Sequence, residues 1–346
     1  MNKRTIKVLL VDDSPFTLEF LKGLLESDPE IKVMDTADNG AEGLEKAISL
    51  LPDVVVMDIE MPLMDGIEAT KRIMQQKPLP ILILTSSLNT RHLYRSLDAI
   101  KYGALEILNK PTPRPTKEWQ RIDEVLVQTI KKVAFLEKGS IIPSLYPGME
   151  ADYIPASDYS AIGIASSTGG PTVLNTLFTG LTPAFPLPIL VAQHISEGFV
   201  QGLVDWLSKQ SSMTFKVGEE GEPLKGGTVY FAPTGAHIAV QGSKLKLLFS
   251  GPVRGILPSG NLLLESLAHS FGNRSMGMIL TGMGNDGREG AHLIHSFGGL
   301  MIAQEPASAV VSSMPMQIIK EKMARYILTP LQINGALMAM ERGENL

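Results

Sequence analysis

Residues 7–14 read KVLLVDDS and residues 54–58 read VVVMD, so two short apolar runs each end in aspartate. Further apolar runs follow, separated by amphipathic stretches such as Thr17–Ser27 and Ala41–Leu50. This alternation predicts a doubly wound parallel sheet with helices on both faces, of the flavodoxin-like kind. The strands expected here are Lys7–Val11, Ile31–Asp35, Val54–Met57, Ile81–Leu84 and Ala104–Leu108.

A second series of strands and helices begins near Tyr159 and predicts another α/β domain with a parallel, Rossmann-like sheet. We expect Thr228–Ala232 and Lys244–Phe249 to form a β excursion outside that sheet, and a helix to begin at about Thr172. The expected core strands are Tyr159–Ala165, Pro188–Ala192, Ser275–Leu280 and Met301–Gln304.

The chain of 346 residues is long enough for two domains that each bury a core. A stretch rich in Pro, Gly and Ser at 139–157 follows a helix expected at about 119–136. We therefore predict a domain at 1–125, a helical and Pro/Gly/Ser-containing linker at 126–157, and a second domain at 158–346.

Composition narrows the function classes. The chain has no cysteine, which excludes disulfides, thiolate metal sites and cysteine nucleophiles. No apolar run reaches the roughly 18 residues of a membrane span, and Asp12 and Asp13 interrupt the first apolar run too early for a signal peptide. A net charge of -5 argues against a nucleic-acid partner. We expect a cytoplasmic protein without membrane insertion.

Carboxylates gather at the predicted strand ends of the first domain. Asp12, Asp13 and Asp58 would meet in one crevice, where hard oxygen ligands suit Mg2+. Thr85 ends the fourth strand and Lys110 follows the fifth, so both could bind the oxygens of a phosphoryl group accepted by a carboxylate. The alternative is that each aspartate only caps a helix or turn. Five such residues at strand ends favour the phosphoryl-accepting site.

These motifs resemble the receiver domain of two-component response regulators over roughly residues 5–125. The resemblance implies that a histidine kinase phosphorylates Asp58. It also implies that Asp12, Asp13, Asp58 and the backbone of Glu60 hold Mg2+. Ile107 stands where the family often has an aromatic switch residue, three positions before the lysine.

Three strand ends of the second domain carry residues typical of a hydrolase. The loop SSTGG at 166–170 could cradle phosphate or expose a serine nucleophile, and its glycines permit a tight turn. His194 follows the next strand, and Asp286 lies in the loop TGMGNDG at 281–287. Serine, histidine and aspartate so placed can form a triad, although each one alone could be a cap or a core residue.

The same three segments resemble the chemotaxis response regulator family of protein-glutamate methylesterase/protein-glutamine glutaminase, in which a receiver precedes this domain. The resemblance implies Ser167, His194 and Asp286 as catalytic residues, with Thr168 assisting His194 and the Met283 amide in the oxyanion hole. It implies no cofactor for the esterase reaction. The implied partners are a histidine kinase and methylated chemoreceptors, whose glutamate methyl esters yield glutamate and methanol, with deamidation of glutamines by the same acyl chemistry.

Some loops depart from the family pattern. The segment Arg-Pro-Ser-Val-Asp is replaced by LPSGN at 257–261, and Pro-Gly-Asp-x-His by PTGAH at 233–237. The stretch after the Gln-His pair also differs, at 195–199. We expect these loops to shape the substrate groove. Two alternatives follow: a non-catalytic response regulator, or a hydrolase that acts on a different protein or a small ester.

Overall fold

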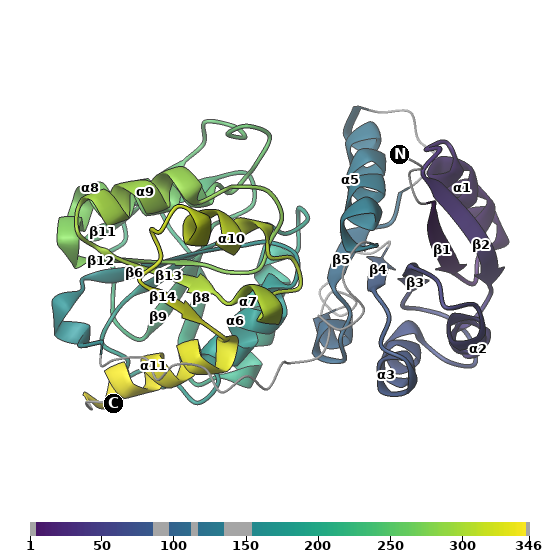
Figure 1. Ribbon diagram of the computed structural model, residues 1–346, viewed down its shortest axis with the longest axis horizontal. Helices are drawn as coiled ribbons and strands as arrows, with labels where there is room; N and C mark the ends of the chain where they lie inside the picture. The colour runs from purple at the N-terminus through teal and green to yellow at the C-terminus, as the bar shows by residue number, and fades with distance from the viewer. Residues whose placement is uncertain (1–4, 86–96, 112–116, 135–153, 344–346) are drawn as a thin grey trace. The chain divides into compact units, whose positions relative to one another are not determined.

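The computed structural model describes residues 5–85, 97–111, 117–134 and 154–343 (Figure 1). The chain divides into two compact units, Met1–Ile142 and Pro143–Leu346. Helix α5 continues through the predicted boundary at 125, and residues 135–153 of the predicted linker lie outside the described part. The domain limits at 125 and 157 therefore stay predictions.

The N-terminal unit is a five-stranded parallel sheet of order β2-β1-β3-β4-β5, which confirms the flavodoxin-like prediction. Its strands are β1 (Ile6–Val11), β2 (Ile31–Ala37), β3 (Val54–Asp58), β4 (Ile81–Thr85) and β5 (Glu106–Asn109). Its described helices are α1 (Pro15–Glu26), α2 (Gly40–Leu50), α3 (Gly66–Gln76) and α5 (Lys117–Val133). The strand order reverses between β1 and β3, so the residues that follow these strands line one crevice.

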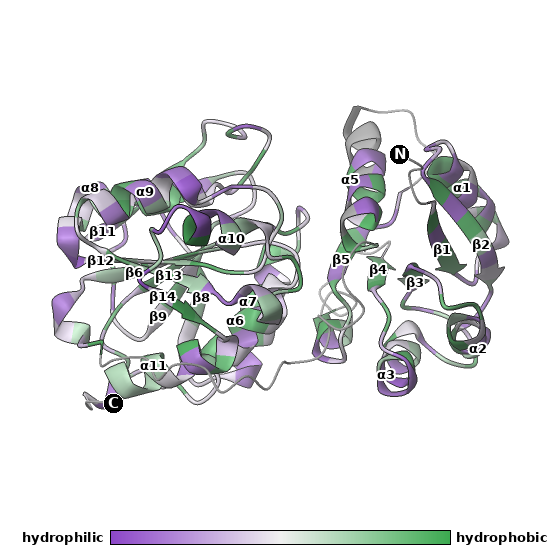
Figure 2. Ribbon diagram, viewed as in Figure 1, coloured by the Kyte–Doolittle hydropathy of each residue, from purple (hydrophilic) through white to green (hydrophobic). Residues whose placement is uncertain are grey.

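Burial explains why these segments form these elements. Every residue of β3 and β4 is buried, as expected for parallel strands covered on both faces, and Figure 2 shows the sheet strands in apolar colours. Helix α1 buries Leu18, Leu21 and Leu25, a spacing that places all three on one helical face. Its N-terminus is capped by the side chain of Ser14, which accepts a hydrogen bond from the Thr17 amide.

The C-terminal unit is built on a seven-stranded sheet of order β14-β13-β12-β6-β7-β9-β8, in which every pair is parallel. Its strands are β6 (Ala161–Ser166), β7 (Ile189–Gln193), β8 (Thr214–Val217), β9 (Thr228–Phe231), β12 (Ser275–Ile279), β13 (Leu300–Gln304) and β14 (Tyr326–Leu328). An antiparallel hairpin joins β10 (His237–Gln241) to β11 (Lys244–Leu248). The helices are α6 (Gly170–Phe178), α7 (Val200–Gln210), α8 (Gly260–Phe271), α9 (Arg288–Ser296), α10 (Ser313–Lys320) and α11 (Pro330–Arg342), with short 3-10 turns at Ala156–Asp158, Gly272–Arg274 and Pro306–Ser308.

One strand prediction was wrong. Thr228–Ala232 was expected in an excursion with Lys244–Phe249, but β9 lies inside the main sheet between β7 and β8. All four residues of β9 are buried, so its short apolar run is that of a parallel core strand. The hairpin partner of β11 is instead β10, and the edge strands β8 and β14 were not predicted because they are short and partly exposed.

The central strands decide where functional groups can meet. Strand β6 pairs with β7 on one side and with β12 on the other, and the chain runs outward from β6 in both directions. The loops after these three strands therefore share one crevice at the carboxyl edge of the sheet. Among the described residues, no helix is long and apolar enough to cross a membrane.

Helix α3 packs closely against β3 at Gly66. A Cβ on Gly66 would lie 2.0 Å from the Asp58 carbonyl oxygen, whereas a Cβ on Gly23 of α1 would meet no atom within 4 Å. We expect Gly66→Ala to destabilise the N-terminal unit by about 1–3 kcal/mol because the backbone must shift. Gly23→Ala should stabilise it by about 0.4–1 kcal/mol. Hydrogen exchange of β1 and β3 peptides in the full chain under increasing urea measures both; equal effects of the two substitutions would contradict the packing argument.

Candidate functional site

The N-terminal unit brings three carboxylates together. Ligand oxygens of Asp12, Asp13 and Asp58 lie within 4.8 Å of one another, at the ends of β1 and β3. Lys110 Nζ lies 2.7 Å from Asp12 Oδ2 and 3.0 Å from Asp58 Oδ2. Asp12 and Asp58 are buried and Asp13 is exposed, so the cluster has one face open to solvent. Carboxylates of this density suit a hard divalent cation.

Electrostatics distinguish Asp58 within the cluster. Burial raises the pKa of Asp58 to about 6, and the nearby Asp12 carboxylate acts in the same direction, whereas the Lys110 ammonium partly opposes both. Burial alone would lower the pKa of Lys110, but the negative charges of Asp58 and Asp12 raise it, so Lys110 stays an ammonium. The charged form of Asp58 is thus incompletely stabilised by the protein, and a cation among the three carboxylates would favour it.

The other predicted residues of this unit lie around the cluster. Thr85 is buried at the end of β4, and its carbonyl oxygen accepts a hydrogen bond from the Lys110 amide at 2.8 Å. Glu60 is exposed two residues beyond Asp58. Ile107 is buried within β5. The structure thus brings the five strand-end residues to one edge of the sheet.

In the C-terminal unit, the two serines of the SSTGG loop have different environments. Ser166 is fully buried, and its hydroxyl donates to Gln193 Oε1 at 2.5 Å. Ser167 is partly exposed, just beyond the end of β6. The Gln193 amide nitrogen donates to the carbonyl oxygens of Ser167 and His194, at 2.9 and 2.7 Å. Gln193 therefore ties the serine loop to the histidine loop and leaves Ser167 as the serine that can meet a substrate.

His194 and Asp286 form a hydrogen-bonded pair. His194 Nε2 lies 2.8 Å from Asp286 Oδ2, and the His194 side chain is 18% exposed while that of Asp286 is 2% exposed. The His194 amide donates to the Ser166 carbonyl oxygen at 2.9 Å, which places the His194 main chain beside the serine loop. With Nε2 directed at the carboxylate, Nδ1 is the nitrogen that can accept a proton from a hydroxyl.

The start of α8 surrounds Asp286 with donors. The Gly260 amide donates to Oδ2 at 2.6 Å, while the Asn261 amide and the Ser259 hydroxyl donate to Oδ1 at 3.1 and 3.0 Å. Burial alone would raise the pKa of Asp286, but the hydrogen bond and charge of His194 and these backbone amides together lower it below the ordinary value. Asp286 is thus a carboxylate held in one orientation toward His194.

The loop that contains Met283 packs against the serine loop. The Ser167 amide donates to the Thr281 carbonyl oxygen at 3.0 Å, and the Thr281 hydroxyl donates to the Thr168 carbonyl oxygen at 2.9 Å. A Cβ on Gly282 would lie 2.8 Å from the Ser167 Cβ, so only glycine allows this approach. Thr168 is buried and Met283 is 41% exposed. The roles of Thr168 and Met283 stay predictions.

A second serine and histidine lie near the same aspartate, and the sequence analysis missed both. Ser259 and His237 belong to a buried network with Asp286, but the Ser259 hydroxyl donates to the carboxylate and not to the ring. Ser259 is 1% exposed and His237 is fully buried, so neither can meet an ester. Ser259 could have been found from sequence as the N-cap of a helix that starts at Gly260. His237 and Gln193 lie in segments that correspond to family motifs, but nothing in the sequence indicates the contacts that they make.

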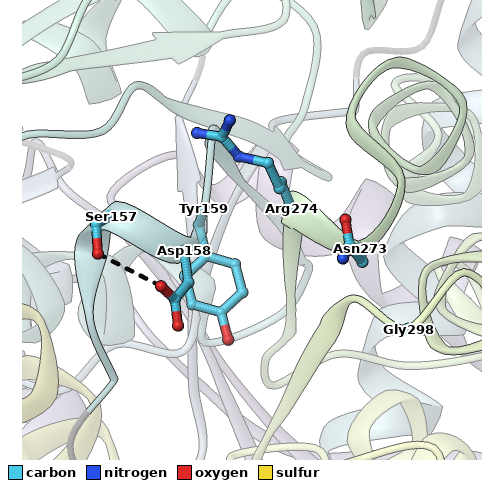
Figure 3. Close-up of a pocket in the computed structure, with 6 residues that line it drawn as sticks. All are labelled: Ser157, Asp158, Tyr159, Asn273, Arg274 and Gly298. Carbon is cyan, nitrogen blue, oxygen red and sulfur yellow. Dashed lines mark hydrogen bonds between the residues drawn. The ribbon is translucent and has the colours of Figure 1, made fainter.

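One open cavity of about 470 Å³ lies elsewhere on this unit (Figure 3). Its lining residues Tyr159, Arg274 and Gly298 precede strands β6, β12 and β13, so it lies at the amino edge of the sheet. Ser167, His194 and Asp286 follow strands at the opposite, carboxyl edge. The cavity is therefore separate from the cluster formed by Ser167, His194 and Asp286. That cluster carries convergent polar groups, which makes it the candidate functional site.

Comparisons with known proteins cover almost the whole chain. Residues 8–117 match the response regulator receiver domain and residues 162–337 match the CheB methylesterase family. The chain is 34% identical to a protein-glutamate methylesterase/protein-glutamine glutaminase of Syntrophus aciditrophicus, over 97% of this chain and 98% of that protein. It is also 34% identical to the corresponding protein of Thermotoga maritima, over 98% and 100%.

A solved structure agrees with these matches. The crystal structure of the Thermotoga maritima CheB methylesterase catalytic domain is similar to 53% of this chain and 98% of that domain, with 35% identity and a TM-score of 0.50. The two sequence matches occur in the same order as the two structural units. The chain belongs to the CheB family, in which a receiver domain is joined to a methylesterase domain.

Proposed function

We propose that this protein is a protein-glutamate methylesterase in which Ser167 is the nucleophile, His194 the general base and acid, and Asp286 the residue that orients His194. The observation that carries the proposal is the His194 Nε2–Asp286 Oδ2 pair at 2.8 Å beside the partly exposed Ser167, at three adjoining strand ends. Membership of the CheB family supports the reaction class.

The reaction proceeds through an acyl-enzyme. Ser167 Oγ attacks the ester carbonyl carbon of a glutamate methyl ester while His194 Nδ1 takes the serine proton. The oxyanion forms beside the SSTGG loop, where the Met283 amide and the N-terminus of α6 supply donors, and Thr168 supports His194. The tetrahedral intermediate expels methoxide, which takes the proton from His194 and leaves as methanol.

A water molecule then completes the cycle. His194 removes a proton from water as the water attacks the acyl-enzyme carbonyl, and Ser167 leaves with that proton. Glutamate is regenerated on the protein substrate. Glutamine side chains can enter the same sequence with ammonia in place of methanol, which accounts for a glutaminase activity.

The N-terminal unit regulates this reaction in our proposal. A histidine kinase of a chemotaxis-type system phosphorylates Asp58, with Mg2+ held by Asp12, Asp13, Asp58 and the Glu60 backbone. Thr85 and Lys110 bind the oxygens of the phosphoryl group. The metal supplies charge compensation during phosphoryl transfer. The substrates are methylated chemoreceptors, and the protein acts in the cytoplasm without inserting into the membrane.

The two serines provide the first test. We expect Ser167→Ala to reduce methanol release from methylated receptor by several orders of magnitude, because loss of a triad member removes acyl transfer. Ser166→Ala, the matched control in the same loop, should keep most of the activity because its hydroxyl only binds Gln193. An active Ser167→Ala protein beside an inactive Ser166→Ala protein would reverse the assignment.

Phosphorylation provides the second test. We expect a phosphoryl donor with Mg2+ to raise methanol release, and removal of Mg2+ with a chelator or the substitution Asp58→Asn to abolish the increase while leaving basal release. The Asp38→Asn protein serves as control, because Asp38 is an exposed carboxylate outside the cluster. An increase that persists in Asp58→Asn would place the phosphorylated residue elsewhere.

Truncation tests how the receiver acts. If the unphosphorylated receiver inhibits the esterase, a protein that starts at residue 143 should release methanol faster than the unphosphorylated full chain. The boundary follows the division between the two compact units. A truncated protein no faster than the full chain would exclude inhibition, although it would leave the esterase assignment intact.

A further inference from the structure

We propose that His237 is a positioning residue of the esterase site, which acts through Ser259 on the orientation of Asp286 and hence of His194. The inference rests on the proposed function. It gives a role to a histidine that lies outside the triad, on the β10–β11 hairpin, and that never reaches the substrate.

The two ring nitrogens of His237 have different backbone partners. His237 Nδ1 accepts a hydrogen bond from the Ser259 amide at 2.9 Å, and Nε2 lies 2.8 Å from the Gly251 carbonyl oxygen. An amide donor requires a bare Nδ1 and a carbonyl acceptor requires a protonated Nε2, so the contacts select one neutral tautomer. The ring is fully buried and therefore serves as a rigid connector, not as a base.

Ser259 connects His237 to the Asp286 carboxylate. Its amide is held by His237, while its hydroxyl donates to Asp286 Oδ1 at 3.0 Å and caps α8 by accepting from the Leu262 amide at 3.5 Å. The two following amides, of Gly260 and Asn261, also donate to Asp286. The position of one serine therefore sets three of the donors that orient the carboxylate, and Asp286 in turn orients His194.

The hairpin that carries His237 is anchored to the same helix. The Val240 amide donates to the Ser266 hydroxyl at 2.9 Å, and the Ser270 hydroxyl donates to the Val240 carbonyl oxygen at 3.2 Å. Two side-chain hydrogen bonds thus fasten the hairpin to α8, close to the contact between His237 and Ser259. The nearest measured parallel is the hydrogen-bond partner of a metal-ligating histidine, whose loss typically costs about 10–100-fold in activity.

The test compares variants of His237 and Ser259 in the full chain with methylated receptor as substrate. We expect His237→Leu and Ser259→Ala to lower kcat by about 10–100-fold with KM within about threefold, because substrate contacts are unchanged while His194 is less well oriented. His237→Gln, which keeps one acceptor and one donor, should recover part of kcat. His269→Gln, at an exposed histidine on α8, is the matched control and should behave as wild type.

A spectroscopic measurement separates positioning from folding. The far-downfield proton signal of the His194–Asp286 hydrogen bond should be present in wild type and in His269→Gln, and should broaden or disappear in Ser259→Ala, a substitution that changes little volume. Unchanged kcat and an unchanged signal in Ser259→Ala and His237→Leu would overturn the proposal. Wild-type protein without methanol release would instead overturn the proposed function, so the two failures are distinguishable.

Discussion

Asp286 is a buried carboxylate, and the site formed with Ser167 and His194 depends on the hydrogen-bond donors that take the place of water around it. An isolated carboxylate in a protein interior is strongly destabilised unless donors surround it. Here the amides of Gly260 and Asn261, the Ser259 hydroxyl and the His194 ring supply those donors. Since two donors bind each carboxylate oxygen, the carboxylate is held in one orientation. The orientation of the imidazole follows from it.

The N-terminal unit also contains a buried carboxylate, Asp58, but the protein stabilises its charge less completely. Burial raises the pKa of Asp58 to about 6, although the Lys110 ammonium, which contacts both Asp58 and Asp12, partly opposes this rise. A carboxylate that the protein leaves incompletely stabilised gains most from a nearby cation. The two aspartates thus differ in how completely the protein stabilises their charge: hydrogen-bond donors surround Asp286, whereas Asp58 has only partial compensation from Lys110.

Sequence patterns predicted both parallel sheets, and the structure has the candidate site residues at the carboxyl ends of their strands. The reason is that parallel strands buried on both faces leave continuous apolar runs, and the polar residue that ends each run marks the carboxyl edge. The same reasoning misplaced Thr228–Ala232, because a run of four buried residues has no periodicity that distinguishes a core strand from a hairpin strand. It did not predict the contacts of Gln193 and His237, whose partners lie 26 and 22 residues away along the chain. Contacts of that kind arise only once the sheet has formed.

Residues 259–261, within the segment where the sequence departs from the family pattern, lie against Asp286, and their effect on the substrate groove stays a prediction. Ser259, Gly260 and Asn261 bind Asp286, and two of these contacts use backbone amides that any residue except proline provides. Glycine at 260 is matched to its neighbour, since a Cβ there would lie 2.5 Å from the Ala165 Cβ. The Asn261 side-chain oxygen accepts from the Glu289 and Gly290 amides at the start of α9, a role that an aspartate can also fill. The contacts to Asp286 are thus insulated from the substitutions at 260 and 261, because both residues bind the carboxylate through their main-chain amides.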